Sequence, residues 1–438
     1  MSTWQRCTAF SMLCIGLWAN KTGSERAARC SFYERHIRVL TVGHDMYLDL
    51  GDGEVQSIIL GEVLHGYLDM LRLRVEEFNG RFPGLLTLRV AFPRNLEIQD
   101  AIFSMARICL VPSLCKVWCS AMDVFIPSTA FSSNAALAFF QAIPARCPHL
   151  QVWHLDVEES EDVMSDDFAA PSELISVTRS VISQVPNLCC FAAPAWCLIP
   201  SIYDALARQP LLGQIKITDS NESVPDYYDL ARQRSNDIPA HMPWFPRLGV
   251  LHFQGHEGLV LDVLPDPARM GSDGSTISQM PLLHTVDIFA GRSDAHEDPS
   301  RIPSLVKIIN YLQYCPKITQ LELFMDFAPA PSDADIELIA TPWPALQALC
   351  ISPWSMSGRA AAALTLKSLL ILAARCQEID RIDLHLCHGL IPEVPAQHQI
   401  SRASPWITLS LTQTTSEDFL RRFFRRLWPG FRRAILVP

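Results

Sequence analysis

Hydrophobic positions recur along the chain in a fixed order: a proline, any residue, an apolar residue, two residues of any kind, and two apolar residues separated by one. Pro316 begins one such copy, with Ile318, Leu321 and Leu323 at the apolar positions. Because the last two apolar residues are two apart, they point to the same face of a β-strand. Each copy therefore predicts a short strand with one buried face. The copies that carry the proline begin at Pro83, Pro112, Pro148, Pro186, Pro210, Pro246, Pro281, Pro316 and Pro344.

Three further copies lack the proline, and we place their apolar positions at Ile37/Leu40/Val42, Ile379/Ile382/Leu384 and Trp406/Leu409/Leu411. After a longer first gap, successive copies begin about 24–38 residues apart, which is typical of repeats that each hold a helix. A single short strand cannot bury its apolar face alone, but stacked neighbours can. The chain is therefore expected to build one array from these copies.

Apolar residues at helical spacing precede many of the prolines. The expected helices cover Val55–Phe78, Ala135–Ala145, Glu173–Gln184, Ser201–Arg208, Ser304–Tyr314 and Arg359–Arg375. Alternation of helix and strand predicts an α/β leucine-rich-repeat solenoid, a horseshoe with parallel strands on the concave side and helices on the convex side. The alternative is a doubly wound sheet, which would show longer all-apolar strands and a glycine-rich phosphate turn. The sequence shows neither feature.

We expect three parts: an N-terminal segment at 1–35, an irregular repeat array at 36–414, and a C-terminal capping helix and tail at 415–438. Thr415 and Asp418 fit a capping box at the start of that helix. Pro429 is expected to end it. Its apolar face comprises Phe419, Leu420, Phe423, Phe424 and Leu427, and its other face comprises Arg421, Arg422, Arg425 and Arg426. The helix is expected to cover the exposed end of the solenoid core, and the alternative is that it binds an acidic partner or a membrane surface.

Residues between the apolar positions of each strand are expected to face the concave side and to bind a protein partner. Aromatic residues on such a surface are candidate anchors because binding energy concentrates in a few desolvated aromatic or arginine side chains. Trp118, Phe289 and Phe324 are the aromatic candidates. The alternative is that flanking loops cover some of these positions as core. The predicted partner-binding residues are Trp118, His154, Lys216, His252, Asp287, Phe289, Glu322, Phe324, Arg381, Asp383 and His385.

Some of the repeats resemble those of fungal F-box and leucine-rich-repeat proteins. The resemblance rests on Cys315-Pro316-Lys317-Ile318-Thr319-Gln320-Leu321-Glu322-Leu323 and on Phe245-Pro246-Arg247-Leu248. The segment from Phe32 to Leu40 is similar to the one that follows the F-box there, and Leu17-Trp18 would be the end of the F-box itself. The resemblance implies a subunit that holds a substrate on its repeats while the F-box docks to the adaptor of a cullin-type ubiquitin ligase. No Leu-Pro-x-Glu opening is present and few residues precede Ile37, so we expect the F-box to be absent or truncated.

The amino-acid composition limits the classes of partner and the compartments that we expect for this protein. Lysine and arginine number 36 against 46 aspartate and glutamate residues, and the net charge of −10 argues against a general nucleic-acid binder. We expect no membrane partner, because no stretch reaches the ~18–20 apolar residues of a membrane span. The 14 cysteines contain no CxxC pair, which argues against structural zinc and favours reduced cysteines in the cytoplasm or nucleus. The alternative is secretion, since the apolar run Cys7–Ala19 and the sequon Asn20-Lys21-Thr22 also suit a signal peptide and a secreted chain.

Catalytic motifs are missing from the sequence: it has no GxxxxGK[ST] loop, no GxSxG elbow and no HExxH helix. His252 and His256 are four apart, but His252 falls on an expected strand, so we interpret them as ordinary histidines. His385, Cys387 and His388 are interpreted in the same way, since the first two share a strand face that His388 does not. We therefore expect a non-enzymatic protein without metal or cofactor.

Overall fold

The structure is a computed structural model. It describes residues 38–43, 84–92, 96–121, 133–156, 172–218, 245–256, 260, 264, 280–291, 302–353, 363–387, 405–411, 417–431 and 433–437. The chain divides into two compact units, Met1–Cys197 and Leu198–Pro438, which are described separately. The expected N-terminal segment at 1–35 and the expected helix Val55–Phe78 lie outside the described residues.

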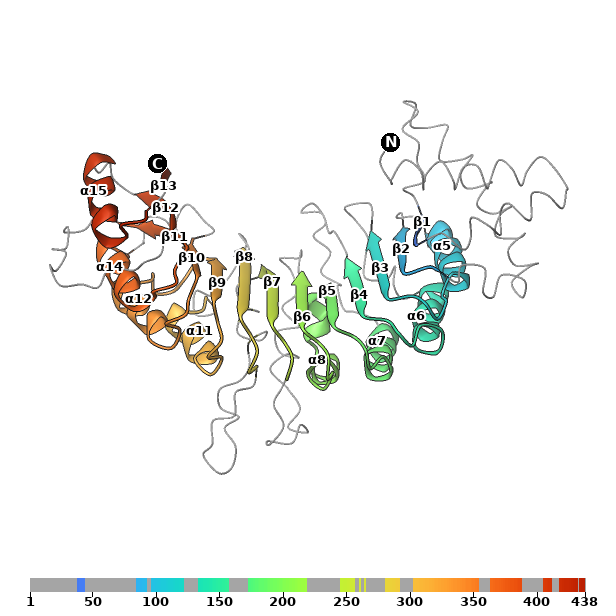
Figure 1. Ribbon diagram of the computed structural model, residues 1–438. Coiled ribbons are helices and arrows are strands. Elements are labelled where there is room, and N and C mark those ends of the chain that lie inside the picture. Colours follow the sequence, from blue (N-terminus) through green and yellow to red (C-terminus); the bar gives the residue numbers. More distant parts are fainter. Residues whose placement is uncertain are drawn as a thin grey trace, which may run out of the picture. The chain divides into compact units, whose positions relative to one another are not determined.

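The first unit is a parallel sheet in which described helices follow three of the strands (Figure 1). Its strands pair in chain order: β1 (Val39–Gly43), β2 (Thr87–Phe92), β3 (Lys116–Ala121), β4 (Val152–Asp156) and β5 (Cys190–Pro194). Its helices are α5 (Leu96–Ile108), α6 (Asn134–Arg146) and α7 (Ser172–Gln184), and the short 3-10 helix η3 (Ala195–Leu198) follows β5. After β2, β3 and β4 a described helix carries the chain back, so the next strand can run in the same direction.

The second unit repeats the same arrangement. Its strands also pair in chain order and in parallel: β6 (Gln214–Thr218), β7 (Val250–His256), β8 (Thr285–Gly291), β9 (Gln320–Phe324), β10 (Ala348–Ser352), β11 (Arg381–Leu386), β12 (Trp406–Leu411) and β13 (Arg433–Val437). Its helices are α8 (Pro200–Ala207), α11 (Leu305–Leu312), α12 (Asp333–Ala340), α14 (Leu366–Arg375) and α15 (Glu417–Leu427).

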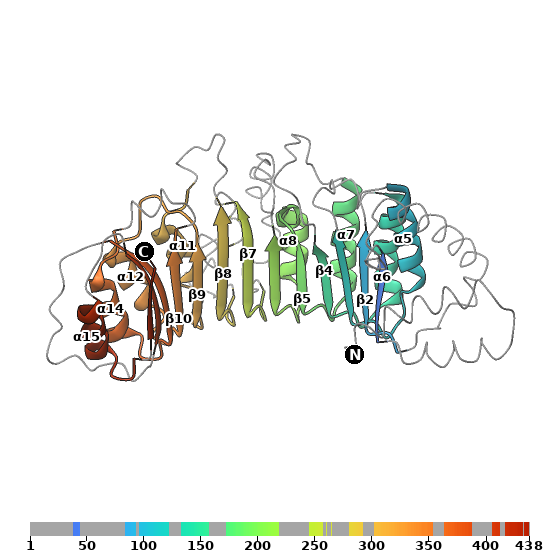
Figure 2. The same cartoon turned by 90° about the horizontal axis from the view of Figure 1, so that it is seen from above.

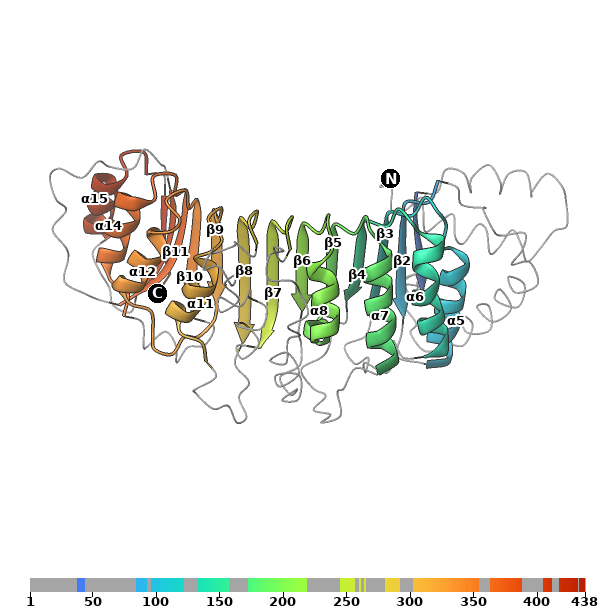
Figure 3. The same ribbon diagram turned by 90° about the horizontal axis from the view of Figure 1, so that it is seen from below.

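In each unit the helices among the described residues lie on one face of the sheet, and none of them covers the other face. Figure 2 shows the strands in front of the helices, and Figure 3 shows the same units from the helix side. Within each unit the strands line the inner side of a curve and the helices its outer side (Figure 1). The fold is therefore the predicted α/β leucine-rich-repeat solenoid, with parallel strands inside and helices outside.

A ladder of backbone hydrogen bonds fixes the register of the turns that enter the strands. The Gly249 carbonyl accepts from the amides of His284 and Thr285 at 2.9 and 3.0 Å, and the His284 carbonyl accepts from Thr319 and Gln320 at 2.9 Å each. The same pattern recurs from turn to turn within both units. A carbonyl of each turn accepts hydrogen bonds from amides of the next turn. The backbone groups at the strand entrances are therefore satisfied by other backbone groups and need no side chain. Neighbouring repeats are thereby held at the same height, and equivalent side chains fall into rows.

Two apolar rows on the helix-covered face form the core. In the second unit the first row is Ile215, Leu251, Val286, Leu321, Leu349, Ile382 and Ile407, and the second is Ile217, Phe253, Ile288, Leu323, Ile351, Leu384 and Leu409. All of these side chains are at most 2% exposed. In the first unit Leu88, Val117, Trp153 and Phe191 form one such row and are fully buried. The repeat pattern therefore predicted the core side of the strands.

The predicted phase of the last proline-free copy is wrong. In the register of β11 and β12, Ile407 lies beside Ile382 and Leu409 beside Leu384, so Leu409 holds the last core position of the pattern rather than its middle one. Trp406, which we placed in the core, is 51% exposed. The sequence was ambiguous because Ile407, Leu409 and Leu411 all stand at alternate positions, so the last two apolar positions of the pattern fit in two places that differ by a shift of two residues. Pairing with β11 fixes which placement is used.

The expected C-terminal tail is also wrong. Helix α15 forms as predicted, but β13 follows it and pairs in parallel with β12. Residues 429–436 in fact carry the repeat pattern, with Phe431, Ala434 and Leu436 at its apolar positions after Pro429. Alanine at the middle position hid this copy, because its small side chain gives a weak apolar signal.

Other differences concern the helices. The expected helices in the regions of α6, α7, α8 and α11 are confirmed with small shifts at their ends. Helix α14 begins at Leu366, where Thr365 caps it by accepting from the Lys367 amide, and not at Arg359 as expected. Helices α5 and α12 were not predicted.

Candidate partner-binding face

The face of each sheet opposite the helices, called the open face, carries the predicted partner-binding residues in rows. In the second unit the central row is Lys216, His252, Asp287, Glu322, Cys350, Asp383 and Thr408. The row towards the strand ends is Thr218, Gln254, Phe289, Phe324 and Ser352, and the row towards the strand starts is Gln214, Val250, Thr285, Gln320, Ala348, Arg381 and Trp406. Predicted residues that are separated along the chain by whole repeats are thus neighbours in space.

Three aromatic rings stack across β7, β8 and β9. The rings of Phe289 and Phe324 are parallel within 11°, with centroids 4.6 Å apart, and the His252 ring lies 5.5 Å from Phe289. The separation of the two phenylalanines follows the spacing of about 4.8 Å between neighbouring strands. Both phenylalanines are only half-buried, so they offer apolar surface on a face that none of the described helices covers.

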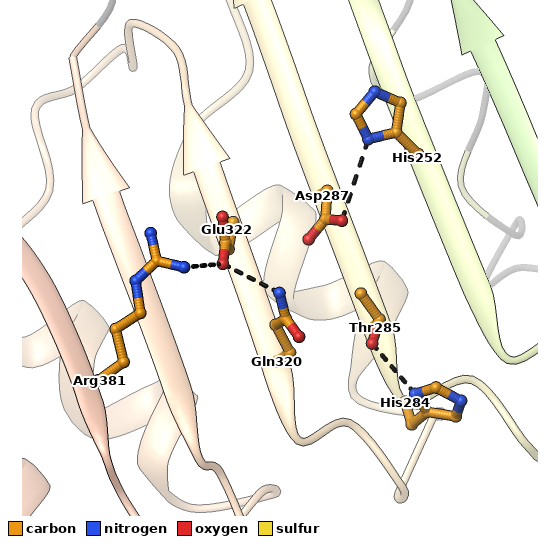
Figure 4. Close-up of polar contacts among 7 residues, drawn as sticks. All are labelled: His252, His284, Thr285, Asp287, Gln320, Glu322 and Arg381. Atoms are coloured by element: carbon orange, nitrogen blue, oxygen red, sulfur yellow. Dashed lines mark hydrogen bonds and ion pairs between the residues drawn. The ribbon is translucent and has the colours of Figure 1, made fainter. Parts of the chain in front are cut away.

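His252 and Asp287 form a loose polar pair beside these rings. The His252 Nδ1 and Asp287 Oδ2 atoms are 3.9 Å apart, and both side chains are about four-fifths buried (Figure 4). The other carboxylate oxygen of Asp287 is buried and accepts no hydrogen bond. A buried acceptor that lacks a donor costs free energy, so Asp287 would gain from a donor that a bound partner supplies.

Glu322 is held more tightly than Asp287. Its Oε1 atom accepts from Gln320 Nε2 at 2.9 Å and from Arg381 Nη1 at 2.8 Å (Figure 4). Arg381 comes from β11, so its side chain passes over β10 to reach β9. The Arg381 side chain is half exposed while the Glu322 side chain is 9% exposed, so the guanidinium covers the carboxylate and shows its outer edge to solvent.

Asp383 and Cys350 have raised pKa values near this pair. Burial raises the pKa of Asp383 above its ordinary value, the nearby Arg381 guanidinium lowers it in part, and the Glu322 charge raises it further. Burial, with smaller contributions from Asp383 and Glu322, raises the pKa of the Cys350 thiol. Cys350 is therefore a protonated thiol between two carboxylates in the central row, and a protonated thiol is a poor nucleophile.

The open face of the first unit carries a different stack. Arg89, Trp118 and His154 lie side by side in the register of β2, β3 and β4. The Arg89 guanidinium carbon is 5.6 Å from the centre of the Trp118 ring, within cation–π range, and the Trp118 and His154 rings are 4.6 Å apart. His154 Nε2 lies 3.4 Å from Cys190 Sγ. Trp118 is 36% exposed, so its ring both packs on its neighbours and faces solvent.

Two predicted contact residues lie deeper than expected. Glu322 is 7% and His385 is 6% exposed, so neither can be a main contact of a partner as the face stands. For Glu322 the reason is the cover that Gln320 and Arg381 provide. Arg89 was missed, although it occupies the pattern position between Leu88 and Val90 that Trp118 holds in the next repeat. Because Arg89 and Trp118 occupy the same position of the repeat pattern, the prediction of Trp118 could have been extended to Arg89.

The described part of the chain holds scattered metal-ligating residues, free cysteines and short helices. No group of three or more histidine, cysteine, aspartate or glutamate residues there could hold a metal ion. The cysteines described are free, and burial raises the pKa of Cys109, Cys147, Cys315 and Cys376 to about 12. Among the described helices none combines the length and hydrophobicity that crossing a membrane requires.

Comparison with known proteins gives likenesses among solved structures alone. No family model matches the chain, and no curated protein matches it. Among solved structures, a chain of the yeast complex of Rad7 and Elc1 is similar at 12% sequence identity and a TM-score of 0.41, over 100% of this chain and 98% of that chain. At this distance the assignment to the leucine-rich-repeat class depends on the strand order, the ladder and the apolar rows described above.

Proposed function

We propose that the protein is a non-catalytic protein-binding module of the cytoplasm or nucleus, and that its partner lies on the open face. The observation that supports this proposal most directly is the row arrangement of Phe289 and Phe324, with Asp287 and His252 beside them, on a face that the helices leave uncovered. Such a surface combines aromatic anchors with polar groups that fix orientation, which is the composition of protein interfaces.

The open face of the first unit carries a second proposed binding surface, which we describe by itself. Trp118 is exposed and already carries the Arg89 guanidinium on its ring, and tryptophan and arginine are the residue types that most often dominate interfaces. Lys216 and Asp383 of the second unit lie in the central row with His252 and Asp287, and Arg381 lies in the row towards the strand starts. We assign all three to the polar rim around the anchors.

The finer role that we propose is substrate recognition for a cullin-type ubiquitin ligase. This step rests on the resemblance of the repeats to those of F-box and leucine-rich-repeat proteins. In that role the open face holds the substrate, and the residues before the repeats contact the ligase adaptor. The alternative is a stand-alone repeat scaffold without a ubiquitin role, which the same open face also suits.

Affinity purification of the full chain from its own cells, followed by mass spectrometry, separates these roles. The ligase role predicts that an adaptor and a cullin copurify together with a second protein that binds the repeats. The scaffold role predicts the second protein alone. Recovery of no stoichiometric partner would contradict both.

A double variant, Phe289→Ala with Phe324→Ala, tests whether the partner uses the open face. We expect it to lose the repeat-bound partner but to keep the adaptor, because the two contacts lie on different parts of the chain. A matched control is Leu338→Ala, which removes an exposed apolar side chain from α12 on the outer face. Equal loss in the variant and the control would place the partner elsewhere.

A further inference from the structure

The outer side of α15 presents four arginines, which follow the acidic residues Glu417 and Asp418 of its first turn. Arg421, Arg422, Arg425 and Arg426 are all exposed. Their spacing of one, four and five residues places them as two adjacent pairs on successive turns of one helix face. Leu420, Phe423, Phe424, Leu427 and Trp428 on the opposite side are at most 4% exposed, so the core fixes which way the arginines point.

Three of these guanidinium groups make no ion pair. The sole polar side-chain contact of Arg422 is a hydrogen bond that its Nε donates to the backbone carbonyl of Asp418 at 3.3 Å, while Arg425 and Arg426 have no side-chain partner in the described structure. Arg375, by contrast, pairs with Glu337 on the same outer side. Like charges at a spacing of four residues repel one another in a helix. Arg422, Arg425 and Arg426 are thus exposed cations without an ion pair, on a protein whose net charge is −10.

The geometry favours one class of anionic partner. A helix that binds a membrane surface inserts its apolar side between the lipids, but here Phe423, Phe424 and Leu427 are buried in the core and cannot insert. A general nucleic-acid binder needs a longer basic stripe to hold phosphates at physiological salt, and a net charge of −10 repels a long polyanion. A short acidic protein segment meets neither obstacle. Arginine suits it because a guanidinium binds a carboxylate through two parallel hydrogen bonds.

We infer that the arginine face of α15 is a second docking surface, separate from the open face, and that it binds an acidic segment of a protein partner. On a helical partner, carboxylates four residues apart lie about one turn apart. The two arginine pairs of α15 have the same spacing, so such carboxylates could face both pairs. The inference does not depend on what binds the open face.

The test measures binding of the full chain to three labelled probes by fluorescence anisotropy at low and physiological salt. The probes are a 12-residue peptide of alternating glutamate and alanine, a 12-nucleotide single-stranded DNA, and vesicles that contain phosphatidylserine. The variant is Arg422→Gln with Arg425→Gln and Arg426→Gln. The matched control removes three exposed positive charges elsewhere, by Arg247→Gln, Lys307→Gln and Lys317→Gln.

We expect the acidic peptide to bind, the triple variant to weaken it about tenfold or more, and the control to bind as the wild type does. Arg→Lys changes at the same three positions are expected to give an intermediate affinity, because charge remains but paired hydrogen bonding is lost. This conservative variant also separates loss of binding from loss of folding. No binding of the peptide, equal loss in variant and control, or tighter binding of the DNA or the vesicles at this face would overturn the inference.

Discussion

The open faces of the two units are built from the same repeat and differ in chemistry. In the first unit the stack begins with a cation, since the Arg89 guanidinium covers one side of the Trp118 ring. In the second unit two phenylalanines stack on each other beside two carboxylates. Asp287 is loosely paired with His252, and Glu322 is firmly held by Arg381. The core positions of both units are apolar and nearly interchangeable. The difference teaches that the repeat fixes where a side chain stands, while the residue at each outward position decides what it can bind.

The largest expected effect separates the core from the open face of the first unit. Trp153 is fully buried and its ring contacts Phe140 and Phe191, whereas Trp118 on the adjacent strand is exposed. Trp153→Ala should lower the free energy of unfolding by about 3–5 kcal/mol, and Trp118→Ala by under about 1 kcal/mol. Denaturation with urea, followed by circular dichroism, measures both. Equal losses would mean that Trp118 is part of the core.

In the second unit, two arginine variants compare the stability that an ion pair with a buried carboxylate provides with that of an exposed ion pair. Arg381→Met removes the partner of the buried Glu322 and should cost about 1–3 kcal/mol. The matched change Arg375→Met breaks the 2.6 Å pair with Glu337, in which both side chains are about half exposed, and should cost under about 1 kcal/mol. Urea denaturation compares the two, and a greater loss for Arg375→Met would refute the covered pair.

Affinity for the partner should distinguish the open face of the first unit from the open face of the second unit. Phe289→Ala and Phe324→Ala are each expected to weaken the repeat-bound partner by about 1–2 kcal/mol, or roughly tenfold, because aromatic anchors lose desolvated contact area. Trp118→Ala shows whether the partner extends onto the first unit. Surface binding measurements with the purified partner provide the affinities, and unchanged affinity in all three variants would exclude both stacks from the interface.

The smallest expected effect concerns Asp383 and pH. Because its pKa is higher in the folded protein than in the unfolded chain, the fold binds this proton more tightly, and the stability that results is lost as pH rises through the folded pKa. Asp383→Asn should therefore raise the melting temperature slightly at pH 7, and the gain should vanish below the unfolded pKa of about 3.9. Asp100→Asn, at an exposed position of α5, is the matched control and should change little. A gain that grows towards acid pH would contradict this assignment.

Much of the fold could be predicted because the repeat encodes it locally. The spacing of Leu321 and Leu323 specifies one face of a strand, and equal spacing in the next copy specifies its neighbour. The same logic predicted that Phe289 and Phe324 share a row. The pattern failed where its local signal was ambiguous, at Trp406 beside Ile407, and where it was weak, at Ala434.

Contacts that cross repeats could not be predicted from spacing alone. Arg381 reaches over β10 to Glu322, and this contact depends on the length and rotamer of one side chain. Asp333 at the start of α12 likewise accepts hydrogen bonds from the Thr365 amide and hydroxyl at 2.8 and 2.7 Å, and so joins two helix starts. Each contact links residues that stand more than 30 positions apart, and no local pattern marks either of them.

Site-specific photocrosslinking tests the central claim most directly. A benzoylphenylalanine at position 289 probes the open face, and the same residue at position 338 probes the outer face, where Leu338 is 46% exposed. In cells, or with the purified partner, we expect a crosslinked partner from position 289 and none of that species from position 338. The same partner crosslinked from position 338 but not from 289 would contradict binding at the open face.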